Sequence, residues 1–347
     1  MIDLRIALGL ALLATMPAPA QAQNATREVP AHSVPVPNTV SPQLQKIIAA
    51  PIPANWKDYP KPAAEWKMLA LADAASAAKS LPALREKLHV KVEAVKIDGV
   101  NVFVVTPDDV APNNRNRLLI HIHGGCYVSN PGEAGTREAI FMAAFGRFRV
   151  MSVDYRTPPD HPYPAALDDA VTVYKSAIKT TPAANVAIFG SSAGGALTLS
   201  AVLKAKQDGL PLPGAMAPGT PMADLTEDGD SFHTNAMLDN VLIAPASSCD
   251  ARARLYANGH DLMDPLLSPI YGDMHGLPPA ILTTGTRDLL LSNTVRVHRK
   301  LRQAGVEAAL QIFEGMAHAQ YSRDPDAPES REAFEEIARF FEKHLGK

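Results

Sequence analysis

The chain has 347 residues and carries 33 basic against 36 acidic side chains, which gives a net charge of −3. This balance excludes the basic stripe of a protein that binds nucleic acid or an anionic membrane. Hydrophobic residues make up 46% of the chain and charged residues 20%, so the chain can bury a sizeable core and is not disordered as a whole. Two cysteines are too few for a disulfide scaffold or a cysteine-rich zinc module.

Residues 1–22 have the pattern of a secretory signal peptide. Arg5 precedes an apolar run from Ile6 to Met16, and Ala20-Gln21-Ala22 supplies a small-x-small cleavage site. The run is shorter than the roughly 17–25 residues that a membrane span needs. We therefore expect cleavage after Ala22, export to the periplasm or the medium, and no stable membrane insertion. A retained anchor or a buried helix is the alternative.

Residues 23–89 are predicted to form an N-terminal arm and a small helical cap. Prolines punctuate 23–42, which favours an extended arm because proline lacks a backbone N–H and resists helix. Apolar residues at helical spacing follow in 43–89, where prolines separate the pieces. A second and larger domain, 90–347, is predicted to begin where the hydrophobic period changes.

From Val90 onward, short apolar runs alternate with helical stretches. The first two runs flank the turn Asp98-Gly99, which is typical of a hairpin. The later alternation favours an α/β fold with a mostly parallel sheet and helices on both faces. The predicted strands are 90–95, 100–105, 118–123, 148–153, 186–189, 215–217, 280–284 and 310–313. The predicted helices are 136–145, 164–179, 193–208, 292–304 and 330–345.

Ser192 is the candidate nucleophile. It is the centre of a G-x-S-x-G motif, Gly190 to Gly194, between a predicted strand and a predicted helix. The glycines permit a sharp turn that lifts the Ser192 hydroxyl above the sheet at the helix N-terminus. The motif alone is weakly specific, and a turn that serves only helix–sheet packing is the alternative. The strand–turn–helix context favours the nucleophile.

A second glycine-containing turn, His123-Gly124-Gly125-Cys126, ends an earlier predicted strand. Acyl transfer needs backbone N–H donors aimed at the developing oxyanion, and glycines let the backbone approach without a side chain in the way. The residue after the nucleophile supplies a further N–H. We predict an oxyanion hole built from Gly124, Gly125, Cys126 and Ala193, with a plain strand-end turn as the alternative.

Asp288 and His318 are the candidate partners of Ser192. They follow the predicted strands 280–284 and 310–313, and an open α/β sheet places its site at the carboxyl ends of its strands. The chain order Ser192, Asp288, His318 matches the order that this sheet type uses for nucleophile, acid and base. Each residue alone is more often a surface or capping residue, but together they predict a catalytic triad.

These motifs resemble the hormone-sensitive-lipase-like branch of the α/β-hydrolase esterases, over about residues 90–345 and more weakly over 43–89, that branch's cap. Residues 154–167 are similar to its Tyr-Arg-Leu-Ala-Pro-Glu-His box. Residues 223–236 are similar to a sub-branch that includes monoterpene ε-lactone hydrolases. The resemblance implies an eight-stranded α/β-hydrolase fold for the catalytic domain 90–347.

The same resemblance implies a serine carboxylesterase that hydrolyses short- to medium-chain acyl esters through an acyl-enzyme. It implies a small-molecule ester or lactone as substrate, no cofactor and no nucleic acid. A lactone hydrolase with the same triad is the alternative, and a non-catalytic binder or a serine peptidase is less favoured. The sequence leaves the oligomeric state open, a homodimer included.

The chain departs from the family pattern near the predicted site. Cys126 stands where the third glycine is usual, although its backbone N–H remains available. Ser191 replaces an acidic residue, and we expect this change to loosen hydrogen bonding around the nucleophile. Ala319-Gln320 replaces Gly-Phe after His318, which is expected to reshape the pocket wall. None of these changes removes a member of the triad.

Histidine and cysteine offer two further interpretations. His121 and His123 share one face of a predicted strand, but a catalytic zinc needs three protein ligands. We therefore expect no metal, and one ring to support the glycine turn by a hydrogen bond. An oxidising compartment would permit Cys126 and Cys249 to pair. Because a crosslink would restrict the predicted oxyanion turn, we favour two free thiols, but the sequence leaves the pairing open.

Overall fold

The computed structural model describes residues 26–54, 56–57 and 62–346. The predicted signal peptide, 1–22, lies outside the described residues. The chain divides into two units, Met1–Pro35 and Val36–Lys347. In the first unit, the described residues are extended and exposed. In the second unit, the helices of the predicted cap and the sheet belong together.

An eight-stranded sheet forms the centre of the second unit, in the order β1-β2-β4-β3-β5-β6-β7-β8. Its strands are β1 (Val90–Ile97), β2 (Val100–Pro107), β3 (Leu118–Ile122), β4 (Val150–Asp154), β5 (Val186–Ser191), β6 (Ala215–Gly219), β7 (Ala280–Gly285) and β8 (Ala308–Phe313). The hairpin β1–β2 and the pair β2–β4 are antiparallel, and the remaining pairs are parallel. The predicted strands and the mostly parallel sheet are therefore confirmed.

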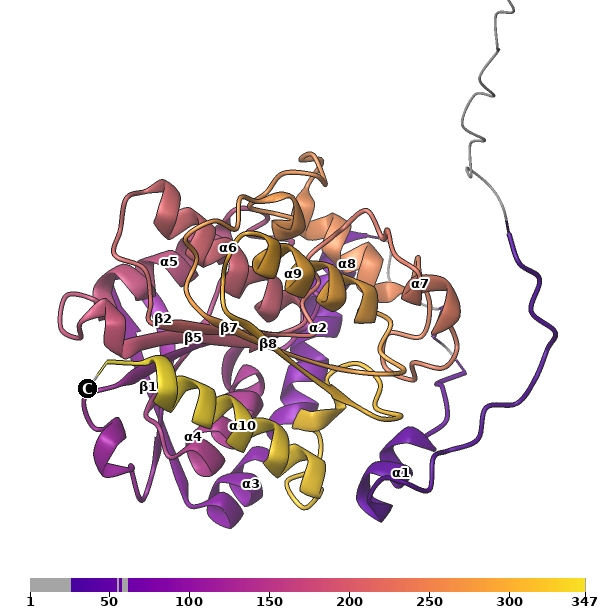
Figure 1. Ribbon diagram of the computed structural model, residues 1–347, viewed down its shortest axis with the longest axis horizontal. Coiled ribbons are helices and arrows are strands. Elements are labelled where there is room, and N and C mark those ends of the chain that lie inside the picture. Colours follow the sequence, from indigo (N-terminus) through magenta and orange to yellow (C-terminus); the bar gives the residue numbers. More distant parts are fainter. Residues whose placement is uncertain (1–25, 55, 58–61, 347) are drawn as a thin grey trace, which may run out of the picture. The chain divides into compact units, whose positions relative to one another are not determined.

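Helices cover both faces of the sheet (Figure 1). They are α1 (Pro42–Ile48), α2 (Ala63–Ala78), α3 (Leu81–Leu88), α4 (Arg137–Gly146), α5 (Ala165–Ala177), α6 (Ala193–Gln207), α7 (Ser231–Thr234), α8 (Ser248–Ala257), α9 (Leu291–Gln303) and α10 (Pro328–His344). One hydrophobic core joins α5, α6 and α9 to the sheet, and a second joins α3, α4 and α10 to its other face. Within the described ranges, none of the helices combines the length and apolar character that crossing a membrane requires.

The sequence pattern explains why these elements pack as they do. Every residue of β3, β5, β6 and β7 is buried, as expected for central strands covered on both faces. Helix α10 buries Phe334, Ile337 and Phe341, a spacing that places them on one helix face. Parallel strands leave their carboxyl ends at one edge of the sheet, and the loops that follow them meet there.

Two helices cover the loop that follows β3. Trp66 of α2 packs against Val128 in that loop, and Ala251 and Leu255 of α8 border the same cluster. Helix α8 belongs to the segment 222–275, an insertion between β6 and β7. The cover is thus built from the N-terminal helices and from this insertion together.

Replacement of Phe334 by alanine tests the second core. Phe334 is fully buried against Phe141 and Tyr321, so its loss leaves a cavity. We expect Phe334→Ala to lower the free energy of unfolding by about 3–5 kcal/mol in urea denaturation. Ile312→Ala is the control, because Ile312 is 48% exposed, and it should cost far less. Equal losses for the two variants would contradict this packing.

Candidate active site

Ser192 lies at the sharp turn between β5 and α6. Its φ is 62° and its ψ is −125°, a conformation that a non-glycine residue rarely adopts. Surrounding hydrogen bonds fix this turn: the Ser192 N–H donates to Gly219 O at 3.0 Å, and the Met222 N–H donates to Ser192 O at 3.0 Å. A side chain at Gly190 or Gly194 would collide with the carbonyl oxygen of Ile122, so the motif requires its glycines here.

Asp288 and His318 lie side by side at the carboxyl ends of β7 and β8. The His318 Nδ1 lies 3.1 Å from Asp288 Oδ1, and both side chains are buried. The other carboxylate oxygen, Oδ2, accepts hydrogen bonds from the hydroxyls of Thr220 and Thr284. The Leu290 N–H donates to Oδ1 at 2.8 Å. The sequence predicted this pair, and the structure brings it together.

Ser192 and His318 line one cavity of about 360 Å³. The wall also includes the predicted oxyanion residues Gly124, Gly125 and Cys126. The outer ring nitrogen of His318, Nε2, is buried and has no hydrogen-bond partner among the described residues. The Ser192 hydroxyl therefore makes no hydrogen bond to Nε2 in this structure, and Nε2 keeps a free acceptor position.

The environment of His318 favours its protonated form. Burial alone lowers the pKa of His318, but the charge of Asp288 and the hydrogen bond to it outweigh burial, so the pKa is raised above its ordinary value. The Asp239 carboxylate, also buried, adds to the increase. The Asp288 and Asp239 carboxylates therefore stabilise the protonated form of the His318 ring.

The turn after β3 has the backbone form that an oxyanion site needs. Gly125 has a φ of 120°, and Cys126 one of 51°. The N–H groups of these two residues have no acceptor among the described residues, and that of Ala193 begins helix α6, where no intrahelical acceptor exists. The His123 Nδ1 donates to Gly124 O at 2.8 Å, which confirms the expected support of the turn by a histidine.

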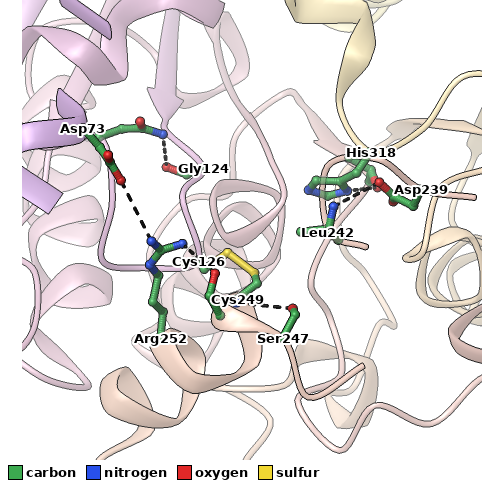
Figure 2. Close-up of a disulfide and its surroundings, with 12 residues drawn as sticks. Asp73, Gly124, Cys126, Asp239, Leu242, Ser247, Cys249, Arg252 and His318 are labelled. Carbon is green, nitrogen blue, oxygen red and sulfur yellow. Dashed lines mark hydrogen bonds and ion pairs between the residues drawn. A yellow bond between two sulfur atoms is a disulfide. The ribbon is translucent and has the colours of Figure 1, made fainter. Parts of the chain in front are cut away.

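Cys126 and Cys249 form a disulfide, with 5.4 Å between their Cα atoms (Figure 2). The expectation of two free thiols is wrong. The crosslink joins the turn to α8 without closing the cavity, which both cysteines line. Next to it, Tyr127 stacks on Tyr256 of α8 with ring centroids 4.3 Å apart. The turn is thus fastened to the cover by a covalent bond and by an aromatic pair.

Ser191 takes part in a tight hydrogen-bond network, contrary to the expectation that it loosens the surroundings of the nucleophile. Its hydroxyl donates to Glu138 Oε1 at 2.6 Å and also contacts the hydroxyl of Tyr321. The other oxygen of Glu138 lies 3.4 Å from His121 Nε2. The carboxylate missing from position 191 is therefore supplied by α4, which lies elsewhere in the sequence.

Sequence reasoning missed the groups that hold Asp288 and the loops around it. Thr220 directly follows β6, and its hydroxyl lies 3.2 Å from His318 Nδ1. Asp239 is fully buried and accepts hydrogen bonds from the N–H groups of Val241, Leu242 and Leu289. The position of Thr220 at a strand end was a usable signal. Asp239 lies in an insertion with no such signal.

No group of three or more His, Cys, Asp or Glu side chains suited to a metal ion occurs in the described part of the chain.

His121 Nδ1 lies 2.9 Å from Ser152 Oγ, and burial lowers the pKa of His123 to about 4. The Asp154 carboxylate accepts from the Gly132 N–H at 2.7 Å, and the Tyr155 hydroxyl donates to His123 O at 3.0 Å. These contacts hold the loops beside the cavity.

Known proteins carry the same fold and related sequences. A family model described as the alpha/beta hydrolase fold matches residues 119–322. An acetyl-hydrolase of Streptomyces hygroscopicus is 31% identical over 254 residues, which are 72% of this chain and 84% of that protein. The chain belongs to the hormone-sensitive-lipase-like esterases of this fold. It is a carboxylic ester hydrolase, and its substrates are small-molecule esters.

Solved structures agree with this assignment. The crystal structure of an esterase E25 is 44% identical with a TM-score of 0.89, covering 92% of this chain and 99% of that one. A structure of EstE5 soaked with p-nitrophenyl butyrate is 26% identical with a TM-score of 0.76, covering 88% and 99%. A further sequence relative, an esterase of Acinetobacter venetianus, is 28% identical over 254 residues, which are 72% of this chain and 82% of that protein.

Removal of the disulfide tests its contribution to stability. The two cysteines are 123 residues apart, so the bond constrains a long loop of the unfolded chain. We expect the double variant Cys126→Ser/Cys249→Ser to lose about 2–4 kcal/mol of unfolding free energy in urea. A reducing agent should lower the stability of the native chain and leave the double variant unaffected. Equal sensitivity of both chains to reduction would contradict the prediction.

Proposed function

We propose that this enzyme hydrolyses short- to medium-chain acyl esters through Ser192, His318 and Asp288. The observation that carries the proposal is the buried Asp288–His318 pair, in which His318 keeps an unpartnered Nε2 and lines the same cavity as Ser192. A nucleophile, a base and a group that orients the base are the parts that such a mechanism needs.

The chemistry proceeds in two steps. The Ser192 Oγ attacks the ester carbonyl carbon while His318 Nε2 takes the hydroxyl proton. His318 then delivers this proton to the oxygen of the leaving alcohol, and the acyl group remains on Ser192. Water attacks the acyl-enzyme, with His318 as base again, and the carboxylic acid leaves. Asp288 holds the ring and stabilises its protonated form throughout.

The negative charge that develops on the carbonyl oxygen needs donors in place. We assign that role to the backbone N–H groups of Gly125, Cys126 and Ala193, with Gly124 forming the turn that presents them. Each such donor contributes on the order of 10²–10³ in rate. The disulfide and the Tyr127–Tyr256 stack hold this turn before substrate arrives.

The size of the cavity supports the proposed acyl range. A volume of about 360 Å³ lies near the low end of small-molecule pockets, which favours short and medium acyl groups. A lactone has the same reacting bond, so a substrate panel should contain lactones beside open-chain esters. The sequence similarity of 223–236 to a lactonase sub-branch is the reason to include them.

We also propose that the enzyme is exported after cleavage at Ala22. The pattern of residues 1–22 supports export. The disulfide supports it independently, because structural disulfides persist in oxidising compartments and are rare in the cytosol. Mass spectrometry of the protein recovered from the periplasm or the medium tests this by the position of its first residue.

Replacement of Ser192 by alanine tests the nucleophile. We expect Ser192→Ala to lower kcat/KM for p-nitrophenyl butyrate by a factor on the order of 10⁶, because no covalent intermediate can form. Ser76→Ala, at an exposed position of α2, should leave the rate unchanged. Thermal unfolding of both variants checks that each is folded. Turnover by Ser192→Ala within about a hundredfold of the native rate would refute the assignment.

The pH profile tests the pairing of His318 with Asp288. His318 must be neutral to act as base, and Asp288 raises its pKa, so activity should fall with decreasing pH from above about 6.5. In Asp288→Asn this increase is lost while burial still lowers the pKa. The acid limb of kcat should therefore move to lower pH, with kcat reduced about 10⁴-fold. An acid limb at the same pH in both enzymes would contradict the pairing.

A further inference from the structure

The wall of the catalytic cavity carries an excess of positive charge. Among the described residues that line it are three arginines, Arg137, Arg252 and Arg323, and one carboxylate, Glu138. The Glu138 side chain is only 12% exposed and is occupied by Ser191 and His121. Its carboxylate forms no ion pair with these arginines, and its single negative charge leaves the described wall with a net positive charge.

The three arginines differ in their partners. Arg252 lies beside the disulfide, with Asp73 at 4.0 Å (Figure 2). The ring of Trp66 lies 5.0 Å from the Arg252 guanidinium carbon. Arg137 donates to the neutral hydroxyl of Ser80 at 2.7 Å. Among the described residues, no carboxylate lies within ion-pair distance of Arg137 or Arg323.

Arg137 and Arg323 lie close enough to sense each other's charge. Arg323 is exposed to solvent, although the protein atoms around its guanidinium lower its pKa and the positive charge of Arg137 lowers it further. The negative charge of Asp239 raises the pKa of Arg323. The Asp239 carboxylate is buried, however, and accepts hydrogen bonds from backbone N–H groups. Two positive charges on one cavity wall repel each other, although solvent screens the repulsion, and an anion bound between them would gain from both.

We propose that Arg137 and Arg323 bind a carboxylate on the substrate, so that the preferred substrates are esters with a second, negatively charged carboxyl group. Guanidinium groups present paired N–H donors that match the two oxygens of a carboxylate. Arg323 follows His318 in the same loop, and Arg137 begins α4, so both reach the cavity from its wall. The inference rests on the proposed function, since the ester is cleaved at Ser192.

Matched esters test the anion site on either side of the scissile bond. On the acyl side, monoethyl adipate is compared with the ethyl ester of adipamic acid, in which a neutral amide replaces the carboxylate. On the alcohol side, the butyrate ester of glycolic acid is compared with that of glycolamide. Acid release at constant pH gives kcat/KM for each, and the carboxylate-to-amide ratio cancels differences in the amount of active enzyme.

We expect the native enzyme to prefer the carboxylate at least tenfold on one of the two sides, which identifies the side that faces the arginines. Arg137→Gln and Arg323→Gln should each lower that ratio severalfold, and 0.5 M NaCl should lower it in the native enzyme. Arg299→Gln is the matched control, because Arg299 is exposed on α9 and absent from the cavity wall, and its ratio should equal the native one.

Two results would overturn the inference. Ratios of one or less on both sides in the native enzyme would do so, as would native ratios in both Arg137→Gln and Arg323→Gln. In either case, hydrolysis of the neutral amides by the native enzyme would leave the proposed function standing. A native enzyme that hydrolyses none of the four esters would overturn both proposals.

Discussion

The carboxylate of Asp288 is fully buried, and several loops at one edge of the sheet donate hydrogen bonds to it. A buried carboxylate is costly unless its oxygens find donors. Here the donors come from the end of β6 (Thr220), from β7 (Thr284), from the turn after β7 (Leu290 N–H) and from the loop after β8 (His318). The carboxylate therefore ties three strand ends together, and the orientation of the His318 ring follows from it.

The turn after β3 is also fixed in position, but by a disulfide and aromatic stacking instead of hydrogen bonds to a carboxylate. Cys126 and Tyr127 both have positive φ values, 51° and 67°, which non-glycine residues avoid. The disulfide to Cys249 and the stack of Tyr127 on Tyr256 fasten these residues to α8. On the other side, His123 stacks on Tyr155 with ring centroids 4.1 Å apart. The N–H groups of the turn are thus oriented before a substrate binds, which is what stabilisation of a developing charge requires.

The sequence was sufficient for the features that repeat a known pattern. Short apolar runs located all eight strands, the G-x-S-x-G motif led to Ser192, and strand-end positions led to Asp288 and His318. The sequence was insufficient where a contact is made by a residue that lies far away in the chain. Glu138 supplies from α4 the carboxylate that position 191 lacks, and Cys249 reaches Cys126 from an insertion. Such pairings depend on tertiary distances, which spacing along the chain does not contain.

The residues proposed to determine substrate specificity could not be found from the sequence either. Arg137 and Arg323 are ordinary charged residues in the sequence, separated by most of the catalytic domain. Only the fold places both on the wall that Ser192 shares. Arg252 lines the same wall but contacts Asp73 and Trp66. Fold and reaction type follow from the motifs, whereas the choice of substrate follows from side chains that no motif contains.

Covalent labelling tests the central claim, that the buried Asp288–His318 pair activates Ser192. A fluorophosphonate transfers its phosphonyl group to an activated serine and loses fluoride, so peptide mass spectrometry identifies the modified residue. The account predicts a single adduct on the peptide that contains Ser192, and a strongly reduced labelling rate in His318→Ala. An adduct on another serine, or a labelling rate that is the same in His318→Ala as in the native enzyme, would contradict it.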